Sequence, residues 1–325
     1  MGTRRYLLTK IVQAFFTLVF VIVFNFFLFR ILPGDPARLL ARNKLLPASA
    51  VAEQTADFGL DQPLFPQQFL TYVSDTVRGN LGISYKFRRS VTEVIGERFW
   101  RTVLLLGVAT VIFTILGIFM GIWGAWHRGS TYDVSTLTFS LVGYSMPDFW
   151  LGLLLLIMFA VIIPLFPVGQ ITSGPQAGYT GLRAVYDVAG HMVLPTVTLV
   201  LAYIGEYALI MRSSLLDVMG EDYVQTARAK GLRDVYVRRR HAVPNALLPT
   251  VTLIALNLGF IVGGAITVET VFSWPGLGLL EYEALQVPDY PMLQGLFLLF
   301  SVSVIIANLA ADILYGYLDP RVRVA

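Results

Sequence analysis

The chain has no cysteine and only three histidines among its 325 residues. The absence of thiols excludes disulfides, cysteine nucleophiles and cysteine-ligated metal sites. The histidines (His127, His191 and His241) are far apart, and none stands in a His-Glu-x-x-His pattern, so a zinc metalloprotease is excluded as well. We therefore expect no catalytic residue, no metal site and no cofactor in this chain.

Lysine is also scarce, and no lysine follows a glycine: Lys10, Lys44, Lys86 and Lys230 follow Thr9, Asn43, Tyr85 and Ala229. A phosphate-binding P-loop places a lysine directly after a glycine, so that backbone amides and the ammonium group hold the phosphates together. The chain therefore lacks that route to ATP hydrolysis. An ATP-driven role would require a separate subunit.

Charged residues make up only 14% of the chain, against 56% hydrophobic residues, and the mean hydropathy is +0.67. These values lie outside the range of soluble domains. Several uncharged runs reach the roughly 20 residues that a helix needs to cross a hydrocarbon core of about 30 Å. They predict an all-α polytopic membrane protein with six transmembrane helices, near residues 11–31, 102–126, 137–163, 192–212, 247–270 and 291–314.

The basic residues of the short loops predict the orientation of these spans, because such residues remain on the cytoplasmic side. Arg4, Arg5 and Lys10 precede the first span, and further arginines fill the loop between the fourth and fifth spans. Both termini and that loop are therefore predicted to be cytoplasmic. The apolar run of the first span is too long for a signal peptide, so we expect it to be retained as an anchor.

The predicted spans divide the chain into four segments. They are a cytoplasmic tail with the first span (1–32), an external loop-rich lobe (33–101), a core of five spans (102–316) with a cytoplasmic loop (213–246), and a cytoplasmic tail (317–325). Apolar residues at helical spacing predict an amphipathic helix over residues 91–101, on the outer surface. That helix either receives an external partner or packs over the ends of the spans. The residues are Val91, Val94, Ile95 and Phe99.

The cytoplasmic loop predicts a helix over Leu215–Lys230, with acids toward its start and bases at its end, as the helix dipole favours. Gly231 is placed to end it in the left-handed conformation. Two hypotheses remain open: the helix docks into a cleft of a partner, or the loop is basic only because membrane topology demands it. The predicted helical face consists of Leu215, Val218, Met219, Tyr223 and Ala227.

Three acids, Asp148, Glu206 and Glu269, fall within predicted spans. A charge facing lipid costs about 2.5–3.5 kcal/mol on the mildest scale, so these side chains should face protein or water. Asp148 and Glu206 could line a path that recognises an amino group, or form a proton relay. Alternatively, the acids hold helices together, with Glu206 pairing with Arg212. We also expect Pro147 to kink the third span.

Two small-residue pairs, Gly117-x-x-x-Gly121 and Gly259-x-x-x-Gly263, predict close packing of the second and fifth spans.

Four strings follow one another along the chain: Leu32–Ala37, Gly79–Ser84, Asp222–Gly231 with Arg240-His-Ala, and Glu269–Gly278. They stand in the order expected of one transporter family. The chain resembles the peptide/nickel branch of the ABC importer permeases, and in particular the first permease subunit of dipeptide and oligopeptide importers. Its match to the "EAA" motif of ABC permeases is partial: Ala227, Gly231 and Pro244 agree, whereas Gln225, Thr226, His241 and Val243 differ.

The resemblance implies a type I importer subunit without enzymatic activity, in a bacterial or archaeal cytoplasmic membrane. It would pair with a second permease, as a heterodimer, and form a path for di- or oligopeptides or related small solutes. Two cytoplasmic ATP-binding subunits and an external substrate-binding protein would be its other partners, with no nucleic acid. The implied ATPase-coupling residues are Glu221, Asp222, Tyr223, Ala227, Arg228, Lys230 and Gly231, and a structural motif contains Glu269, Pro275, Gly276 and Gly278.

The alternative is an ion-coupled secondary transporter, or an intramembrane hydrolase, that uses Asp148, Glu206 and Glu269. The surroundings of Asp148 and Glu206 do not match each other, which disfavours an aspartyl protease, and no inverted repeat is apparent. Dependence on a partner ATPase distinguishes the two classes.

Overall fold

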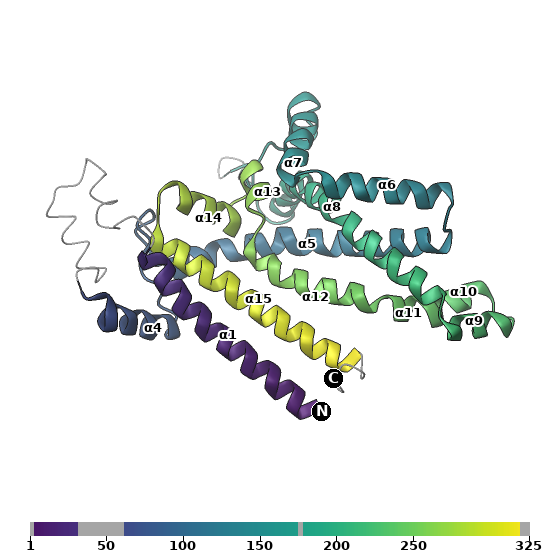
Figure 1. Cartoon of the computed structure of the whole chain (residues 1–325). Coiled ribbons are helices and arrows are strands. Elements are labelled where there is room, and N and C mark those ends of the chain that lie inside the picture. Colours follow the sequence, from purple (N-terminus) through teal and green to yellow (C-terminus); the bar gives the residue numbers. More distant parts are fainter. Residues whose placement is uncertain (1–2, 32–61, 175–177, 319–325) are drawn as a thin grey trace.

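The computed structural model describes residues 3–31, 62–174 and 178–318 (Figure 1). These residues are mostly helical, and the only β-pairing among them is a single bridge between Ile83 and Ser90. The all-α prediction is therefore confirmed. The Leu32–Ala37 string, the first half of the predicted external lobe and the end of the C-terminal tail lie outside the described residues.

Four helices are each long and apolar enough to cross a membrane, and two bent helix pairs raise the number of candidate spans to six. The elements are α1 (Thr3–Ile31), η1 (Leu64–Gln68), α4 (Phe69–Val77), α5 (Val91–Trp126), α6 (Thr131–Ser145), α7 (Asp148–Leu156), η2 (Ile157–Ile162), α8 (Leu182–Met219), α9 (Asp222–Ala229), α10 (Asp234–Val237), η4 (Arg238–Ala242), α11 (Val243–Ala246), α12 (Leu248–Gly263), α13 (Ile266–Val271), α14 (Leu277–Gln286) and α15 (Tyr290–Leu318).

The helices form a bundle around α5 and α8, with α6 packed on α8, α12 on α15, and α15 on α1. The start of α1, the end of α15, the α5–α6 turn and α9 lie toward one end of the bundle, and α4 and α14 lie toward the other (Figure 1). At the first of these ends, Lys10 of α1 forms an ion pair of 3.0 Å with Asp312 of α15.

Glycines let α5 and α8 approach closely. A Cβ atom on Gly117 would lie 2.5 Å from Cβ of Tyr207, and one on Gly121 would lie 2.6 Å from the carbonyl oxygen of Ala208. The predicted packing role of this glycine pair is confirmed, and its partner is α8 of the same chain. Gly259 is similarly close to Ala307 of α15, but a Cβ on Gly263 would meet nothing within 4 Å. In the second pair, therefore, only Gly259 lies at a close contact between helices.

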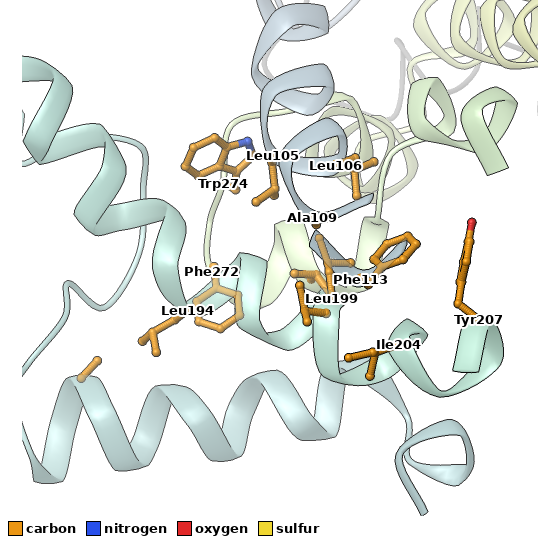
Figure 2. Close-up of a cluster of buried hydrophobic side chains, with 13 residues drawn as sticks. Leu105, Leu106, Ala109, Phe113, Leu194, Leu199, Ile204, Tyr207, Phe272 and Trp274 are labelled. Atoms are coloured by element: carbon orange, nitrogen blue, oxygen red, sulfur yellow. The ribbon is translucent and has the colours of Figure 1, made fainter. Parts of the chain in front are cut away.

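The main core lies where α5 and α8 meet the segment that follows α13 (Figure 2). Apolar side chains of the two long helices surround Phe272 and Trp274, which are 1% and 0% exposed. Burial of such large rings dominates the packing energy of a core. The members shown from α5 and α8 are Leu105, Leu106, Ala109, Phe113, Leu194, Leu199, Ile204 and Tyr207.

The predicted third span is broken rather than kinked. α6 and the α7–η2 pair meet at an angle of 98°, and Met146, the residue before Pro147, has an extended backbone with φ −85° and ψ 130°. Proline disfavours a helical conformation for the residue before it and cannot donate a backbone hydrogen bond. The predicted effect of Pro147 is therefore confirmed, and it is larger than a kink.

Other helix ends also differ from the prediction. α5 begins at Val91, so residues 91–101 are the first turns of the second span rather than a separate surface helix. Val91, Val94 and Ile95 are buried against α14 and α15, which agrees with the packing hypothesis. The fifth span ends at Gly263, because Gly264 has φ +74° and a Cβ there would lie 2.7 Å from the amide nitrogen of Gly278.

α8 is longer than the predicted fourth span and extends from Leu182 to Met219. The first residues of the predicted 213–246 loop therefore belong to a transmembrane helix.

The buried carboxylate of Asp289 fastens the described end of the external segment to the start of α15. Asp289 accepts hydrogen bonds from the hydroxyl of Ser84 and from the backbone amides of Tyr85 and Lys86, both at 3.1 Å. It also accepts one from the amide of Met292, in the first turn of α15. The Gly79–Ser84 string thus has a structural role in this part of the molecule.

We predict that Gly121→Val destabilises the protein by about 1–3 kcal/mol, because the added side chain would collide with the backbone of α8. Thermal unfolding in detergent measures this effect. Gly107→Val is the matched control on the same helix, since a Cβ at Gly107 meets nothing within 4 Å. Equal melting temperatures for the two variants would contradict the packing role of Gly121.

Candidate functional site

The candidate site is the coupling segment, defined here as residues 220–246 between α8 and α12. It contains α9, α10, η4 and α11. The prediction of one helix over Leu215–Lys230 is wrong, because α8 ends at Met219 and α9 begins at Asp222. Glu221 interrupts the helix with an extended backbone, φ −71° and ψ 144°, and occupies the N-cap position of α9.

The predicted role of Gly231 as the C-terminal cap of α9 is confirmed. Its φ is +74°, a left-handed conformation that residues with a side chain adopt only at a cost. The amide of Gly231 donates to the carbonyl of Arg228 at 2.9 Å, and the amide of Leu232 donates to that of Ala227 at 3.4 Å. This pair of hydrogen bonds is a Schellman motif, which satisfies the last carbonyls of the helix and turns the chain.

α9 has one buried face and one exposed face. Val224 and Ala227 are 0% and 5% exposed, and they pack with Val237 of α10 and with Val218 of α8. Tyr223, four residues before Ala227, lies at the edge of this buried face and is 41% exposed. Tyr223 and Ala227 therefore lie on neighbouring positions of α9, as predicted, but only Ala227 is buried. Ala227 shapes the segment from inside, while the other predicted coupling side chains, Glu221, Asp222, Tyr223, Arg228 and Lys230, are exposed.

Two tryptophans at the end of α5 hold the coupling segment in place. The guanidinium of Arg228 lies 5.5 Å from the ring of Trp126, and that of Arg238 lies 5.6 and 5.5 Å from the rings of Trp123 and Trp126. Such cation–π contacts attract the arginines to the faces of the indoles. These contacts were not predicted from the sequence. Two tryptophans at the predicted cytoplasmic end of a span, together with a basic loop on the same side, could have indicated them.

A second group of contacts joins the far side of the segment to the spans. Ala242 and Ala246 are fully buried against Met211 and Leu215 of α8, and the hydroxyl of Ser214 donates to the carbonyl of Ala246 at 2.8 Å. The coupling segment is thus attached to both α5 and α8.

Asp148 and Glu206 both lie in the neighbourhood of Tyr203. Asp148 stands at the start of α7, where it accepts a hydrogen bond of 2.8 Å from the hydroxyl of Thr267 on α13. Tyr203, on the same helix as Glu206, is close enough to both carboxylates for a coulombic interaction with each. Among the described residues, Glu206 has no hydrogen-bond partner, although its side chain is only partly exposed. The structure therefore brings the two predicted path acids into one region.

The predicted pairing of Glu206 with Arg212 is wrong. Arg212 points to Asp133 of α6 instead, with its Nε 2.6 Å from Oδ1 and one terminal nitrogen 2.9 Å from Oδ2. A guanidinium and a carboxylate that share two parallel hydrogen bonds form a strong and directional pair. Asp133 was not among the predicted site residues, because nothing in the sequence relates two charges 79 positions apart.

Glu269 has a structural task at the start of α14. Gly276, the N-cap of that helix, has no side chain to accept its free amides, so Glu269 accepts from the amide of Leu279 at 3.0 Å. The hydroxyl of Thr102 accepts from the amide of Leu277 at 2.7 Å and donates to Glu269 at 2.9 Å. The predicted structural motif therefore caps a helix from two neighbouring elements.

The surrounding residues lock this arrangement against α5. The indole nitrogen of the buried Trp274 donates to the carbonyl of Arg101 at 3.0 Å, and a guanidinium nitrogen of Arg101 lies 3.5 Å from the carbonyl oxygen of Pro275. A Cβ on Gly278 would lie 2.8 Å from the amide nitrogen of Ile266. Gly278 thus stands at a close backbone contact, which explains the glycine at this position of the Glu269–Gly278 string.

The chain is similar to known transport proteins over almost its whole length. Residues 113–324 match the family described as "Binding-protein-dependent transport system inner membrane component", and residues 3–106 match its N-terminal component. The dipeptide transport system permease protein DppB of Escherichia coli K12 is 40% identical, with 94% of this chain and 95% of that protein covered. The glutathione transport system permease protein GsiC of Escherichia coli O6:H1 is 38% identical, with 98% of both chains covered.

We predict that Gly276→Ala destabilises the protein by about 1–3 kcal/mol, because the methyl group would lie 2.5 and 2.6 Å from the two carboxylate oxygens of Glu269. Thermal unfolding measures the loss. Gly96→Ala is the control, since a Cβ at Gly96 meets nothing within 4 Å. A melting temperature of Gly276→Ala equal to that of the wild type would show that Glu269 does not form this cap.

Proposed function

We propose the function of this chain from one premise: it belongs to the family of binding-protein-dependent transport system inner membrane components. It is a membrane-spanning permease subunit of an ATP-driven importer, as its relatives DppB and GsiC are. Those relatives are transport permeases rather than enzymes. We infer that this chain likewise catalyses no reaction and takes its energy from ATPase subunits.

We infer that the complete importer contains this chain, a second permease, two cytoplasmic ATP-binding subunits and an external substrate-binding protein. The coupling segment would face the cytoplasm together with both termini. The basic residues at that end support this orientation, because the positive-inside rule retains them in the cytoplasm. The start of α1, the end of α15 and α9 also lie toward the same end of the bundle (Figure 1).

The substrate that we propose is a small peptide. DppB is named for dipeptides and GsiC for glutathione, and the chain is similar to both over almost its full length. A peptide carries an ammonium group at one end, which a carboxylate recognises well in a partly desolvated site. Asp148 and Glu206, which both lie in the neighbourhood of Tyr203, would supply this recognition in the translocation path.

The observation that carries the proposed coupling role is the two-sided character of α9. Its apolar side chains, Val224 and Ala227, are already buried by packing within the coupling segment and against α8. The rest of its surface, which includes Tyr223 and Lys230, is exposed at the end of the bundle. An aromatic ring surrounded by charged residues is typical of the centre of a protein interface. We propose that this face docks into the ATPase.

ATP-driven closure of the ATPases would then displace α9 and, through α8, change which side of the membrane the path opens to. Gly231 would matter because its Schellman motif fixes the direction in which the chain continues after α9. Membership of a family of ATP-driven importers disfavours an ion-coupled carrier built on Asp148 and Glu206.

We predict that Tyr223→Ala lowers both ATPase copurification and ATP-driven uptake at least tenfold, since truncation of an aromatic interface anchor commonly costs 2 kcal/mol or more. The fold should be unaffected because the ring is exposed. Pull-down of the ATPases and uptake into proteoliposomes measure the two effects. Tyr186→Ala is the control, since that ring is 76% exposed at the opposite end of α8. Normal copurification and uptake by Tyr223→Ala would refute the docking face.

We predict that the double variant Asp148→Asn, Glu206→Gln lowers dipeptide uptake about tenfold, because a charge-assisted hydrogen bond to the peptide ammonium contributes roughly 1.5–3 kcal/mol. ATP hydrolysis by the complex should continue. Uptake of a radiolabelled dipeptide and phosphate release, measured on the same proteoliposomes, test both statements. Asp75→Asn on α4 is the control for loss of an acid outside the proposed path. Unchanged uptake by the double variant would remove these two acids from the path.

A further inference from the structure

We propose that the Asp133–Arg212 ion pair is a positioning contact that transmits movement of the coupling segment to α6, and through α6 to the path residue Asp148. The proposal rests on the proposed function, because it assumes that ATPases move α9. It assigns a role to two residues that neither the sequence motifs nor the path acids include.

The pair lies where three helices meet. Its two side chains are 3% and 17% exposed, and it is joined by two hydrogen bonds. The amide of Gly129 donates to the same carboxylate at 2.9 Å, so Asp133 also closes the α5–α6 turn. A Cβ on Gly124 of α5 would lie 3.2 Å from Oδ1 of Asp133. The carboxylate is thus enclosed by α5, by its own turn and by Arg212.

Arg212 is close to the coupling segment along α8. Seven residues, about two turns, separate it from Met219, where α8 ends and the segment begins. Ser214, two residues further along α8, donates its hydroxyl to Ala246 in the segment. A displacement of the segment therefore reaches Arg212 through continuous helix, and Asp133 is the residue on which Arg212 acts.

α6 carries the displacement onward because it is packed on α8 without intervening side chains. A Cβ on Gly205 would lie 2.6 Å from the carbonyl oxygen of Ser140, and one on Gly143 would lie 3.0 Å from that of Leu201. α6 has 15 residues, about 22 Å of helix, from Thr131 to Ser145. It ends directly at the 98° bend, where Pro147 leads into Asp148. The ion pair thus lies at the start of α6, and the path acid Asp148 follows the other end of α6, as the first residue of α7.

The decisive readout is the number of peptides imported per ATP hydrolysed, because a contact needed only for stability would not change this ratio in the complexes that assemble. The complex of this chain with its second permease, ATPases and binding protein is reconstituted in proteoliposomes, with radiolabelled dialanine as the probe. We expect Asp133→Asn to leave the rate of ATP hydrolysis within about twofold and to lower the transport ratio at least tenfold. A wild-type ratio in Asp133→Asn would overturn the proposal.

A second variant separates transmission from stability. In Asp133→Asn combined with Arg212→Gln no unpaired buried charge remains, so thermal stability should recover relative to the single variant. The transport ratio should stay at least tenfold low, because the charge-assisted contact is still absent. Recovery of the ratio together with stability would show that the pair only holds the fold. Failure of this double variant to assemble would show the same and would also overturn the proposal.

Asp312→Asn is the matched control. It removes one partner of an inter-helix ion pair of 3.0 Å, formed with Lys10, on helices that pack against each other away from the α6–α8 contact. Its transport ratio should equal that of the wild type, and a tenfold loss there would overturn the special role of Asp133. The wild-type complex separates this inference from the proposed function, because absence of ATP-driven uptake in the wild type would refute the function itself.

Discussion

The contact between α5 and α8 is the constraint on which the rest of the structure depends. The two helices can approach only because Gly117 and Gly121 have no side chains, and their approach creates the main core with Phe272 and Trp274. The same contact brings the end of α5 beside the end of α8. The coupling segment can then be held by the tryptophans of one helix and by the buried face of the other.

Polar groups in this apolar bundle divide into two kinds. Asp289, Glu269 and Asp133 are each surrounded by donors from at least two elements, and each closes a turn or caps a helix. A buried carboxylate without partners would be costly, so these acids specify how the elements join. Asp148 and Glu206 differ, since each is partly exposed and has few partners within the described residues. That difference is what makes the latter two the better candidates for contact with a substrate.

Local features of the structure could be predicted from the sequence, and features set by tertiary contacts could not. The apolar runs predicted the spans, Pro147 predicted a disturbance of the third span, and Gly231 predicted the cap of α9, because each depends on neighbouring residues alone. The start of α5 at Val91 depends on burial against α14 and α15.

The same limit applies within the candidate site. The faces of α9 depend on contacts with Val237 and Val218, and the partner of Arg212 lies on another helix. A helical wheel places Tyr223 and Ala227 close together on α9, but it cannot show that Ala227 is buried while Tyr223 remains exposed. The resemblance to a family identified the segment, but only the packing shows which side of α9 remains free.

The central claim is that the exposed face of α9 contacts an ATPase on the cytoplasmic side, and site-directed cross-linking tests it most directly. Because the chain has no native cysteine, Tyr223→Cys introduces a single thiol. The account predicts that this thiol cross-links to the ATPase subunits in inverted membrane vesicles, and that a membrane-impermeant reagent added outside intact cells does not label it. Labelling from outside, or the absence of any cross-link to the ATPases, would contradict the account.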